Sequence, residues 1–189
     1  MLSILKNSRG EILNLLFADT DQKLYLREIA KKLNKSAGEI QGSLEYLFKE
    51  GILEDERVGN LRFFKINKNF LLYEELKKIV SKTIGVEAKI KSLVEEISNV
   101  EVAFIFGSIA KGKENIYSDI DLMLVGQVDE NDLIKKVSPL ETELGREINY
   151  HIYSNEEIKK FLREKNSFLL DIFSGPKIIL KGNLNDYAV

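Results

Sequence analysis

Apolar residues near the start of the chain recur every three to four positions, the spacing that places them on one face of an α-helix. Residues 11–17 form one such stretch, and a second apolar face runs from Leu26 to Leu33. Ser36 predicts the start of a third helix, because Glu39 follows at the spacing of a capping box. The buried positions expected in this third helix are Ala37, Ile40, Leu44, Leu47 and Phe48.

A β-hairpin is expected next, over residues 57–64, because Gly59-Asn60 separates two extended segments. Helix, helix, short turn, helix and hairpin is the order of a winged helix-turn-helix. Residues 8–68 resemble the ArsR/MarR-like winged helices of prokaryotic regulators, and LREIAKKLNKSAGEIQGSLEYLFKEGIL is similar to their two-helix core. We therefore expect a winged helix-turn-helix domain over residues 1–69.

If this domain binds DNA, its third helix enters the major groove by its N-terminal end, and the hairpin reaches phosphate or the minor groove. The residues expected to contact DNA carry polar or basic side chains at the third helix and on the hairpin: Lys35, Ser36, Gln41, Ser43, Arg57 and Arg62. Docking to a protein is the alternative, because Glu39 and Glu45 lie on the same helix.

Residues 70–85 predict a linker helix with one apolar face and an end at Gly85. The alternative is a dimerisation helix, since a winged helix that reads a palindrome needs a second copy. A second domain is then expected to begin at residue 86.

Two apolar runs in this second part have the length of buried strands. The first stops at Gly107-Ser108, where free backbone N–H groups opening a short helix form a cradle for phosphate. The second, residues 119–125, carries Asp119 and Asp121 on one face, because side chains alternate along a strand. Two adjacent carboxylates repel each other unless a cation joins them, and oxygen ligands favour Mg²⁺ or Mn²⁺.

A P-loop is the competing interpretation of this region. Residues 107–113, GSIAKGK, nearly match GxxxxGK followed by Ser or Thr. Glu114 stands where that pattern needs a hydroxyl, and the next strand begins too early to leave room for the P-loop helix. The P-loop interpretation is therefore rejected.

Composition narrows the chemistry further. The chain has 189 residues with no Cys and one His, which excludes disulfides, cysteine-ligated metals, thiol nucleophiles and multi-histidine sites. The net charge of −2 excludes a uniformly basic nucleic-acid coat, although residues 1–84 carry +3 and residues 85–189 carry −5. No apolar run approaches a membrane span and the N-terminus lacks the pattern of a secretion signal, so we expect a cytoplasmic protein without a membrane partner.

The string GSIAKGKENIYSDID, in which Gly-Ser is followed after ten residues by Asp-x-Asp, resembles the motif of the polymerase-β-type nucleotidyltransferases. It is most similar to the minimal nucleotidyltransferases of bacteria and archaea, over about residues 86–182. The resemblance implies an αβ domain around a short mixed sheet. It also implies attack on the α-phosphate of an NTP, which places an NMP on an acceptor and releases pyrophosphate.

The same resemblance implies roles for single residues. The two aspartates of the motif would be catalytic and would bind the metals, while Gly107 and Ser108 would hold the triphosphate. Lys111 and Lys113 lie in the intervening loop and are candidates to neutralise phosphate. A solvated basic loop is the alternative for these two lysines.

The family's third carboxylate comes from a later strand, which is expected here at residues 147–153. Asn149 occupies that position and is the third residue expected to be catalytic, although an amide can ligate a cation but cannot take a proton. Glu147 and His151 share its face by the period of two, and His151 is a candidate base. Between the two strands, Ser138-Pro139 predicts a break or kink within the helical residues 130–144.

These patterns together predict a two-domain α+β protein: a winged helix-turn-helix and, over residues 86–189, a nucleotidyltransferase-fold domain with a small mixed sheet flanked by helices. The expected function is metal-dependent transfer of an NMP, with Mg²⁺ or Mn²⁺ as cofactor and ATP as the expected NTP. The acceptor is a protein, a nucleic acid or a small molecule.

DNA is the first partner expected. A protein acceptor or toxin partner would fit the toxin–antitoxin relatives of the second domain, and a homodimer would suit operator reading. The alternative function is a transcription regulator whose second domain is an inactive nucleotide sensor, which Asn149 motivates.

Overall fold

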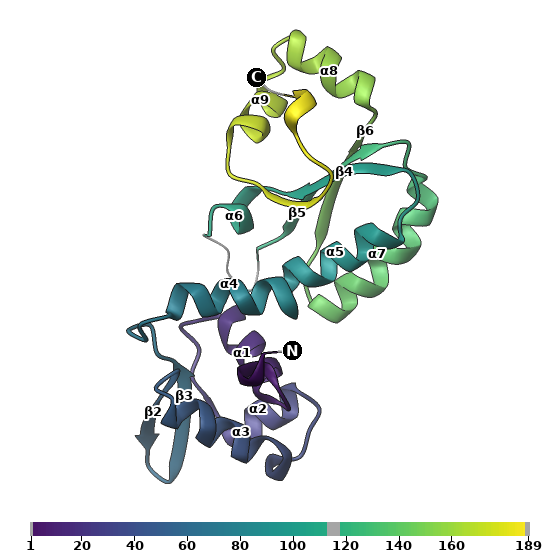
Figure 1. Ribbon diagram of the computed structural model, residues 1–189. Coiled ribbons are helices and arrows are strands. Elements are labelled where there is room, and N and C mark those ends of the chain that lie inside the picture. Colours follow the sequence, from purple (N-terminus) through teal and green to yellow (C-terminus); the bar gives the residue numbers. More distant parts are fainter. Residues whose placement is uncertain (1, 113–117, 188–189) are drawn as a thin grey trace. The chain divides into compact units, whose positions relative to one another are not determined.

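The structure is a computed structural model, and it describes residues 2–112 and 118–187 (Figure 1). The chain divides into two compact units, Met1–Gly85 and Val86–Val189. Each unit has its own buried apolar residues. In the described residues, no helix has the length and apolar character needed to cross a membrane.

The first unit combines helices with a small antiparallel sheet whose strand order is β1-β3-β2. Its elements in chain order are η1 (Ser3–Leu5), α1 (Arg9–Ala18), β1 (Leu24–Tyr25), α2 (Leu26–Lys32), α3 (Ala37–Lys49), β2 (Leu53–Val58), β3 (Leu61–Ile66) and α4 (Tyr73–Thr83). The helix, helix, helix, hairpin order predicted from the sequence is therefore present.

Local signals fix the start of α3 and the turn of the hairpin. The Ser36 hydroxyl accepts a hydrogen bond from the Glu39 N–H, and the Glu39 carboxylate accepts one from the Ser36 N–H at 2.7 Å, which is the predicted capping box. Val58 pairs with Leu61, so Gly59 and Asn60 form a two-residue turn, with Gly59 at φ +58°.

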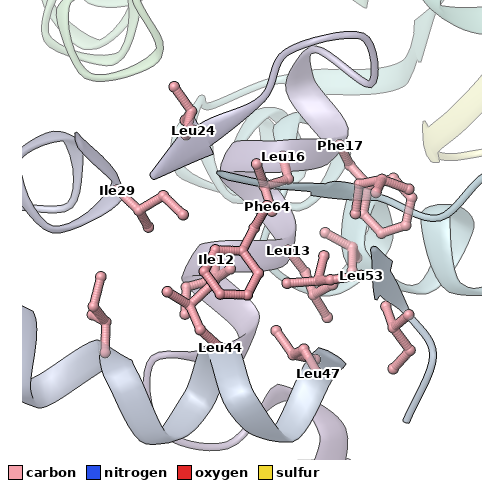
Figure 2. Close-up of a cluster of buried hydrophobic side chains, with 14 of the residues drawn as sticks. Ile12, Leu13, Leu16, Phe17, Leu24, Ile29, Leu44, Leu47, Leu53 and Phe64 are labelled. Atoms are coloured by element: carbon pink, nitrogen blue, oxygen red, sulfur yellow. The ribbon is translucent and has the colours of Figure 1, made fainter. Parts of the chain in front are cut away.

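The core of the first unit lies between α1, α3 and the sheet (Figure 2). Ile12 and Leu16 of α1 pack in the same buried cluster as Leu44 of α3 and Phe64 of β3. The residues expected to form a linker, 70–85, belong to this unit as well, because Leu76 and Val80 of α4 are buried in the same cluster. The linker prediction was wrong, since the apolar face of this helix packs on its own unit.

The second unit is a mixed four-stranded sheet with helices on both faces. Its elements are α5 (Val86–Glu96), β4 (Val100–Ile105), α6 (Gly107–Ala110), β5 (Ile120–Gly126), α7 (Glu130–Leu144), β6 (Ile148–Tyr153), α8 (Asn155–Arg163), α9 (Ser167–Ser174), β7 (Ile178–Lys181) and η2 (Asn185–Tyr187). The strand order is β6-β5-β4-β7; β5 and β6 run parallel, and the other pairs are antiparallel. This agrees with the small mixed sheet that was expected.

Alternation along the central strand sends side chains into two separate cores. Ile120, Leu122 and Leu124 of β5 pack with α5 and α7, which lie side by side (Figure 1). Met123 and Val125 pack on the other face, with α8 and α9. Because both faces are covered, a polar side chain at the start of β5 is exposed only at the end of the sheet.

Helix α7 contradicts one expectation. A break or kink was predicted at Ser138, and the break is absent, because α7 runs without interruption from Glu130 to Leu144 with Pro139 in its interior. The buried side chains of Leu133 and Val137 hold the helix on the sheet. Packing has therefore overridden the local preference of proline.

Candidate active site

A glycine without room for a side chain forms one wall of the candidate site. Gly107 follows strand β4 with φ +68° and opens the short helix α6. A Cβ at this position would lie 1.9 Å from the Asp121 Oδ2 atom. The Phe106 N–H donates to the Asp121 carbonyl at 3.0 Å, which holds the turn against β5. The motif glycine is thus required by sterics as well as by backbone conformation.

The three polar residues predicted to be catalytic converge at one end of the sheet. Asp121 pairs with Asn149 across the parallel strands β5 and β6. The Asn149 amide donates from Nδ2 to Asp119 Oδ2 at 3.3 Å. Asp119 is exposed and directly precedes β5, while Asp121 and Asn149 are half-buried. The structure therefore brings together residues that are 30 positions apart in the sequence.

The two aspartates occupy different electrostatic environments. Burial, and then the charge of Asp119, raise the pKa of the Asp121 carboxyl. Positive charge on His151 and on Lys111 acts in the opposite direction and lowers that pKa. Ionised Asp121 is therefore held at a cost in free energy that a bound cation would remove.

The donor set fits a hard divalent cation. Asp119 and Asp121 offer carboxylate oxygens, and the Asn149 amide supplies a further oxygen if it rotates away from Asp119. Within residues 2–112 and 118–187, no group of three His, Cys, Asp or Glu side chains is arranged to hold a metal. The site thus has two carboxylates and one amide, a set suited to Mg²⁺ or Mn²⁺.

An aromatic cluster borders the same face of the sheet. The His151 ring lies 5.1 Å from the Phe168 ring of α9 and 5.9 Å from the Phe106 ring, between centroids. A positive charge on the His151 ring would lower the pKa of the Asp121 carboxyl. Glu147, the other residue considered on this face, is exposed just before β6. Phe168 was not predicted to lie at the site, because it is 17 positions from His151 in the sequence and only tertiary packing joins them.

The residues predicted to bind phosphate are only partly placed. Gly107 and Ser108 form the first turn of α6, and Ser108 is half-buried. Lys111 is exposed at the end of this turn. Lys113 lies outside the described residues.

One anchoring residue was missed by the sequence analysis. The Arg146 guanidinium donates from Nε to the Ser118 carbonyl at 2.6 Å. Ser118 precedes Asp119, so this bond fixes the chain where the first aspartate enters the site. The contact spans 28 residues, and no local pattern around Arg146 indicates it.

Most of the residues predicted to contact DNA are engaged within the first unit. Lys35 forms an ion pair with Glu11 and donates to the Ser8 hydroxyl, and the Ser36 hydroxyl caps α3. Gln41 and Arg57 have exposed side chains. These two are the predicted contacts that project from α3 and from the hairpin into solvent.

Ser43 and Arg62 do not support the prediction. Ser43 is only 8% exposed and faces the core, so its assignment as a DNA contact was wrong. Arg62 forms ion pairs with Glu45 at 2.5 Å and Asp55 at 2.6 Å, and it stacks over two phenylalanine rings, those of Phe48 and Phe64. The period of α3 turns Ser43 inward, and neighbouring carboxylates hold Arg62 on the sheet.

Comparisons with known proteins come from structures and from a family model. A toxin–antitoxin structure with AMP-PNP is 21% identical, covering 54% of this chain and 77% of that chain, with a TM-score of 0.38. The tri-AMPylated Shewanella oneidensis HEPN toxin in complex with the MNT antitoxin is 19% identical, covering 53% of this chain and 72% of that chain, with a TM-score of 0.33. No curated protein matches the chain.

The family model is the decisive comparison. The model described as polymerase beta, nucleotidyltransferase matches residues 88–183, which is 96 of the 189 residues. The matched segment contains the whole sheet of the second unit and every residue of the candidate active site. The chain therefore belongs to the polymerase-β-type nucleotidyltransferase family.

Proposed function

We propose that this protein is a metal-dependent nucleotidyltransferase that moves an NMP from an NTP, with ATP as the expected donor, to a hydroxyl acceptor. The observation that carries the proposal is the meeting of Asp119, Asp121 and Asn149 beside the bare backbone of Gly107. Asp119 and Asp121 would hold Mg²⁺ or Mn²⁺, and Gly107 and Ser108 would bind the triphosphate.

The reaction forms one bond and breaks one bond at the α-phosphorus. The acceptor oxygen attacks the α-phosphorus, the bond to the bridging α–β oxygen breaks, and pyrophosphate leaves. A divalent cation, when bound, supplies positive charge at the phosphate oxygens. Gly107 contributes by letting backbone N–H groups approach the phosphates where a side chain would collide with Asp121.

The acceptor proton needs a destination, because the Asn149 amide cannot receive it. His151 lies on the same face of β6 as Asn149, two residues farther along. We assign the proton to the His151 imidazole. A His151→Gln variant is expected to lose transfer while keeping metal-dependent NTP binding.

The first experiment is a transfer assay with a matched inactive protein. Purified protein receives Mg²⁺ or Mn²⁺, each α-labelled NTP in turn, and a lysate of the source organism. The Asp119→Asn/Asp121→Asn double variant serves as the control. The proposal is supported if the original protein labels an acceptor and the double variant does not. It is contradicted if the original protein binds NTP in a metal-dependent way but labels no acceptor.

A nucleotide sensor is the second candidate function, and Asn149 is the observation that favours it. An amide at the third position can help to bind a cation–nucleotide pair but provides no base. The Asn149→Asp variant separates the two functions. A weak enzyme gains transfer activity with this substitution, whereas a sensor continues to bind nucleotide without turnover.

We further propose that the first unit is a winged helix that binds DNA. Support comes from the α3-hairpin order and from the exposed side chains of Gln41 on α3 and Arg57 on β2. Nucleic-acid affinity of this kind falls with salt, because bound lysines and arginines release counterions.

Duplex binding by the full chain across a salt series tests this second proposal. Arg57→Ala is expected to lower the slope of log affinity against log salt by about one, and Lys159→Ala, an exposed change on α8, is expected to leave it unaltered. Absence of salt-dependent binding, or an equal effect of the two variants, would favour the protein-docking alternative.

A further inference from the structure

We propose that the free edge of strand β6 binds an extended, basic segment of another polypeptide by strand addition, and that this segment carries the acceptor group past the active site. The proposal rests on the nucleotidyltransferase function for the identity of the acceptor. It rests on the structure of the edge for the binding itself. The two parts can therefore be tested separately.

The hydrogen-bonding register shows which backbone groups of β6 are available. Among the strands of the described residues, β6 is the terminal one of this sheet and has β5 as its one neighbour. The Ile120 N–H donates to the Glu147 carbonyl at 2.9 Å, and the strands then pair in parallel from Ile120–Ile148 onward. In a parallel ladder, alternate residues bond to the neighbour, so the groups of Asn149 and His151 face β5.

The intervening residues direct their backbone groups outward. The Ile148 N–H is already satisfied, since it donates to Glu141 Oε1 at 2.8 Å. Tyr150 and Ile152 come next in the outward register, and in the described residues nothing pairs with their N–H groups. An added strand would find two donors and the adjacent carbonyls in one row.

This edge lacks the protection that sheet edges usually carry. Exposed edge strands are commonly blocked by charged side chains, proline or a bulge. β6 reads Ile-Asn-Tyr-His-Ile-Tyr, without Lys, Arg, Asp, Glu or Pro, and it pairs with β5 in an unbroken register. An unblocked edge of this composition is suited to pairing with another chain.

A groove beside the edge is continuous with the candidate active site. The groove has a volume of about 620 Å³ and lies between β6 and α7. Ile134 and Val137 of α7 provide its apolar wall, and Asp121 is among its lining residues. Because side chains of an added strand alternate, one set would enter this groove and the other would lie on the face of Asn149 and His151.

The charged side chains that line the groove indicate which kind of polypeptide segment binds there. Among the described residues, the groove lining contains three carboxylates, those of Asp121, Glu141 and Glu147, against one basic side chain, that of His151, and neither Lys nor Arg. Glu130 adds a fourth near the edge, where it accepts a hydrogen bond from the Tyr150 hydroxyl. A nucleic acid would be repelled, and a second copy would bring the same carboxylates to the interface. A segment rich in Lys or Arg is the complementary partner.

The test uses the full chain without NTP and a synthetic probe, acetyl-Val-Lys-Val-Lys-Val-Lys-Val-amide. Two control peptides replace Lys by Glu or carry N-methyl groups on every backbone nitrogen. Binding is followed by NMR, with hydrogen exchange of the backbone amides. We expect the amide protons of Tyr150 and Ile152 to become protected, while those of Asn149 and His151 change little. Each control peptide is expected to bind at least about tenfold more weakly.

Two protein variants examine the same edge. Tyr150→Pro removes the outward N–H, a change that an edge strand tolerates, and should weaken the basic peptide by about tenfold or more. Tyr150→Val keeps the N–H and loses only the ring, so it should bind within about threefold of the original. If the proline variant does not fold, the N-methylated peptide supplies the equivalent comparison.

Three results would overturn the proposal: no binding of the basic peptide up to millimolar concentration, equal binding of the acidic peptide, or binding without protection at Tyr150 and Ile152. Protection of these amides in the free protein, together with a dimeric mass, would instead assign the edge to a second copy. Loss of nucleotide transfer with peptide binding intact would remove the proposed enzyme function and leave the docking surface in place.

Discussion

Gly107 is the residue whose replacement gives the sharpest test of the site geometry. An alanine Cβ would lie 1.9 Å from Asp121 Oδ2 and 2.9 Å from Cγ, so Gly107→Ala must displace the aspartate. We expect metal-dependent nucleotide binding to fall by at least about tenfold, and stability to fall by more than the roughly 1 kcal/mol typical of alanine in a left-handed conformation.

Gly112 provides a matched control for this variant. It has nearly the same φ, +66° against +68°, but among the described residues a Cβ there would meet nothing within 4 Å. Gly112→Ala should therefore show the backbone cost alone and retain nucleotide binding. Equal losses of binding in the two variants, measured by titration with Mn²⁺ and ATP, would mean that contact with Asp121 is not what requires glycine.

Asp121 makes the stability of the metal-free protein depend on pH in an unusual direction. Burial and the charge of Asp119 raise its pKa in the folded state, so the folded protein holds this proton more tightly than the unfolded chain. The resulting penalty is full above the raised pKa and disappears below about pH 4, where both states are protonated.

Asp121→Asn should therefore stabilise the metal-free protein at pH 7, and the gain should shrink as the pH approaches about 4. Addition of Mn²⁺ should raise the unfolding temperature of the original protein and leave that of the variant unchanged. Thermal unfolding in EDTA and in Mn²⁺ over a pH series measures both effects. A variant that is less stable than the original at pH 7 in EDTA would show that the carboxylate is stabilising without a cation.

At the scale of elements, α7 retains a proline that the helix does not need for its own stability. Pro139 lies inside the continuous helix, so the Lys135 carbonyl lacks the N–H that would normally donate to it. Pro139→Ala should stabilise the second unit by about 1–3 kcal/mol, while Ser138→Ala should have little effect. The rate of amide hydrogen exchange in β5 measures the stability of this unit. An unchanged rate in the Pro139→Ala variant would mean that packing of the proline ring stabilises the unit by as much as the missing hydrogen bond destabilises it.

The uninterrupted α7 also shows that sequence patterns predict this structure only where it depends on residues close in the sequence. The capping box of Ser36 and the Gly59-Asn60 turn were predictable because each depends on neighbours within four residues. The aspartate pair was predictable because alternation along a strand is local as well. The contact of Arg146 with Ser118 depends on chain segments 28 residues apart, for which no local pattern exists.

Arg62 is a case in which a local pattern exists but tertiary contacts overrule it. Its position on the hairpin predicted an exposed DNA contact, but Glu45 of α3 and Asp55 of β2 hold it on the protein. Tertiary packing likewise overrides the helix-breaking tendency of Pro139, because the buried side chains of Leu133 and Val137 hold α7 on the sheet. Local propensity fails where tertiary partners compete with it, and both cases are of this kind.

At the scale of the whole molecule, the two units have separate cores and opposite charge. The apolar cluster of the first unit includes residues from Leu5 to Val80, and the clusters of the second unit begin at Ile90. Residues 1–84 carry +3 and residues 85–189 carry −5. This division suits a polyanionic ligand on the first unit and a cation-dependent site on the second.

Ligands should therefore protect the two units independently, and amide hydrogen exchange of the full chain can show this. At a concentration 100 times its dissociation constant, a ligand stabilises the unit that binds it by about 2.7 kcal/mol, which slows exchange by opening of that unit about 100-fold. Mn²⁺ with ATP should slow exchange in β4, β5 and β6 and leave α1 and α3 unchanged. Duplex DNA should do the reverse. Protection of both units by either ligand alone would reveal energetic coupling between them. Because a coupling free energy is reciprocal, nucleotide would then change the affinity for DNA by the same factor by which DNA changes the affinity for nucleotide.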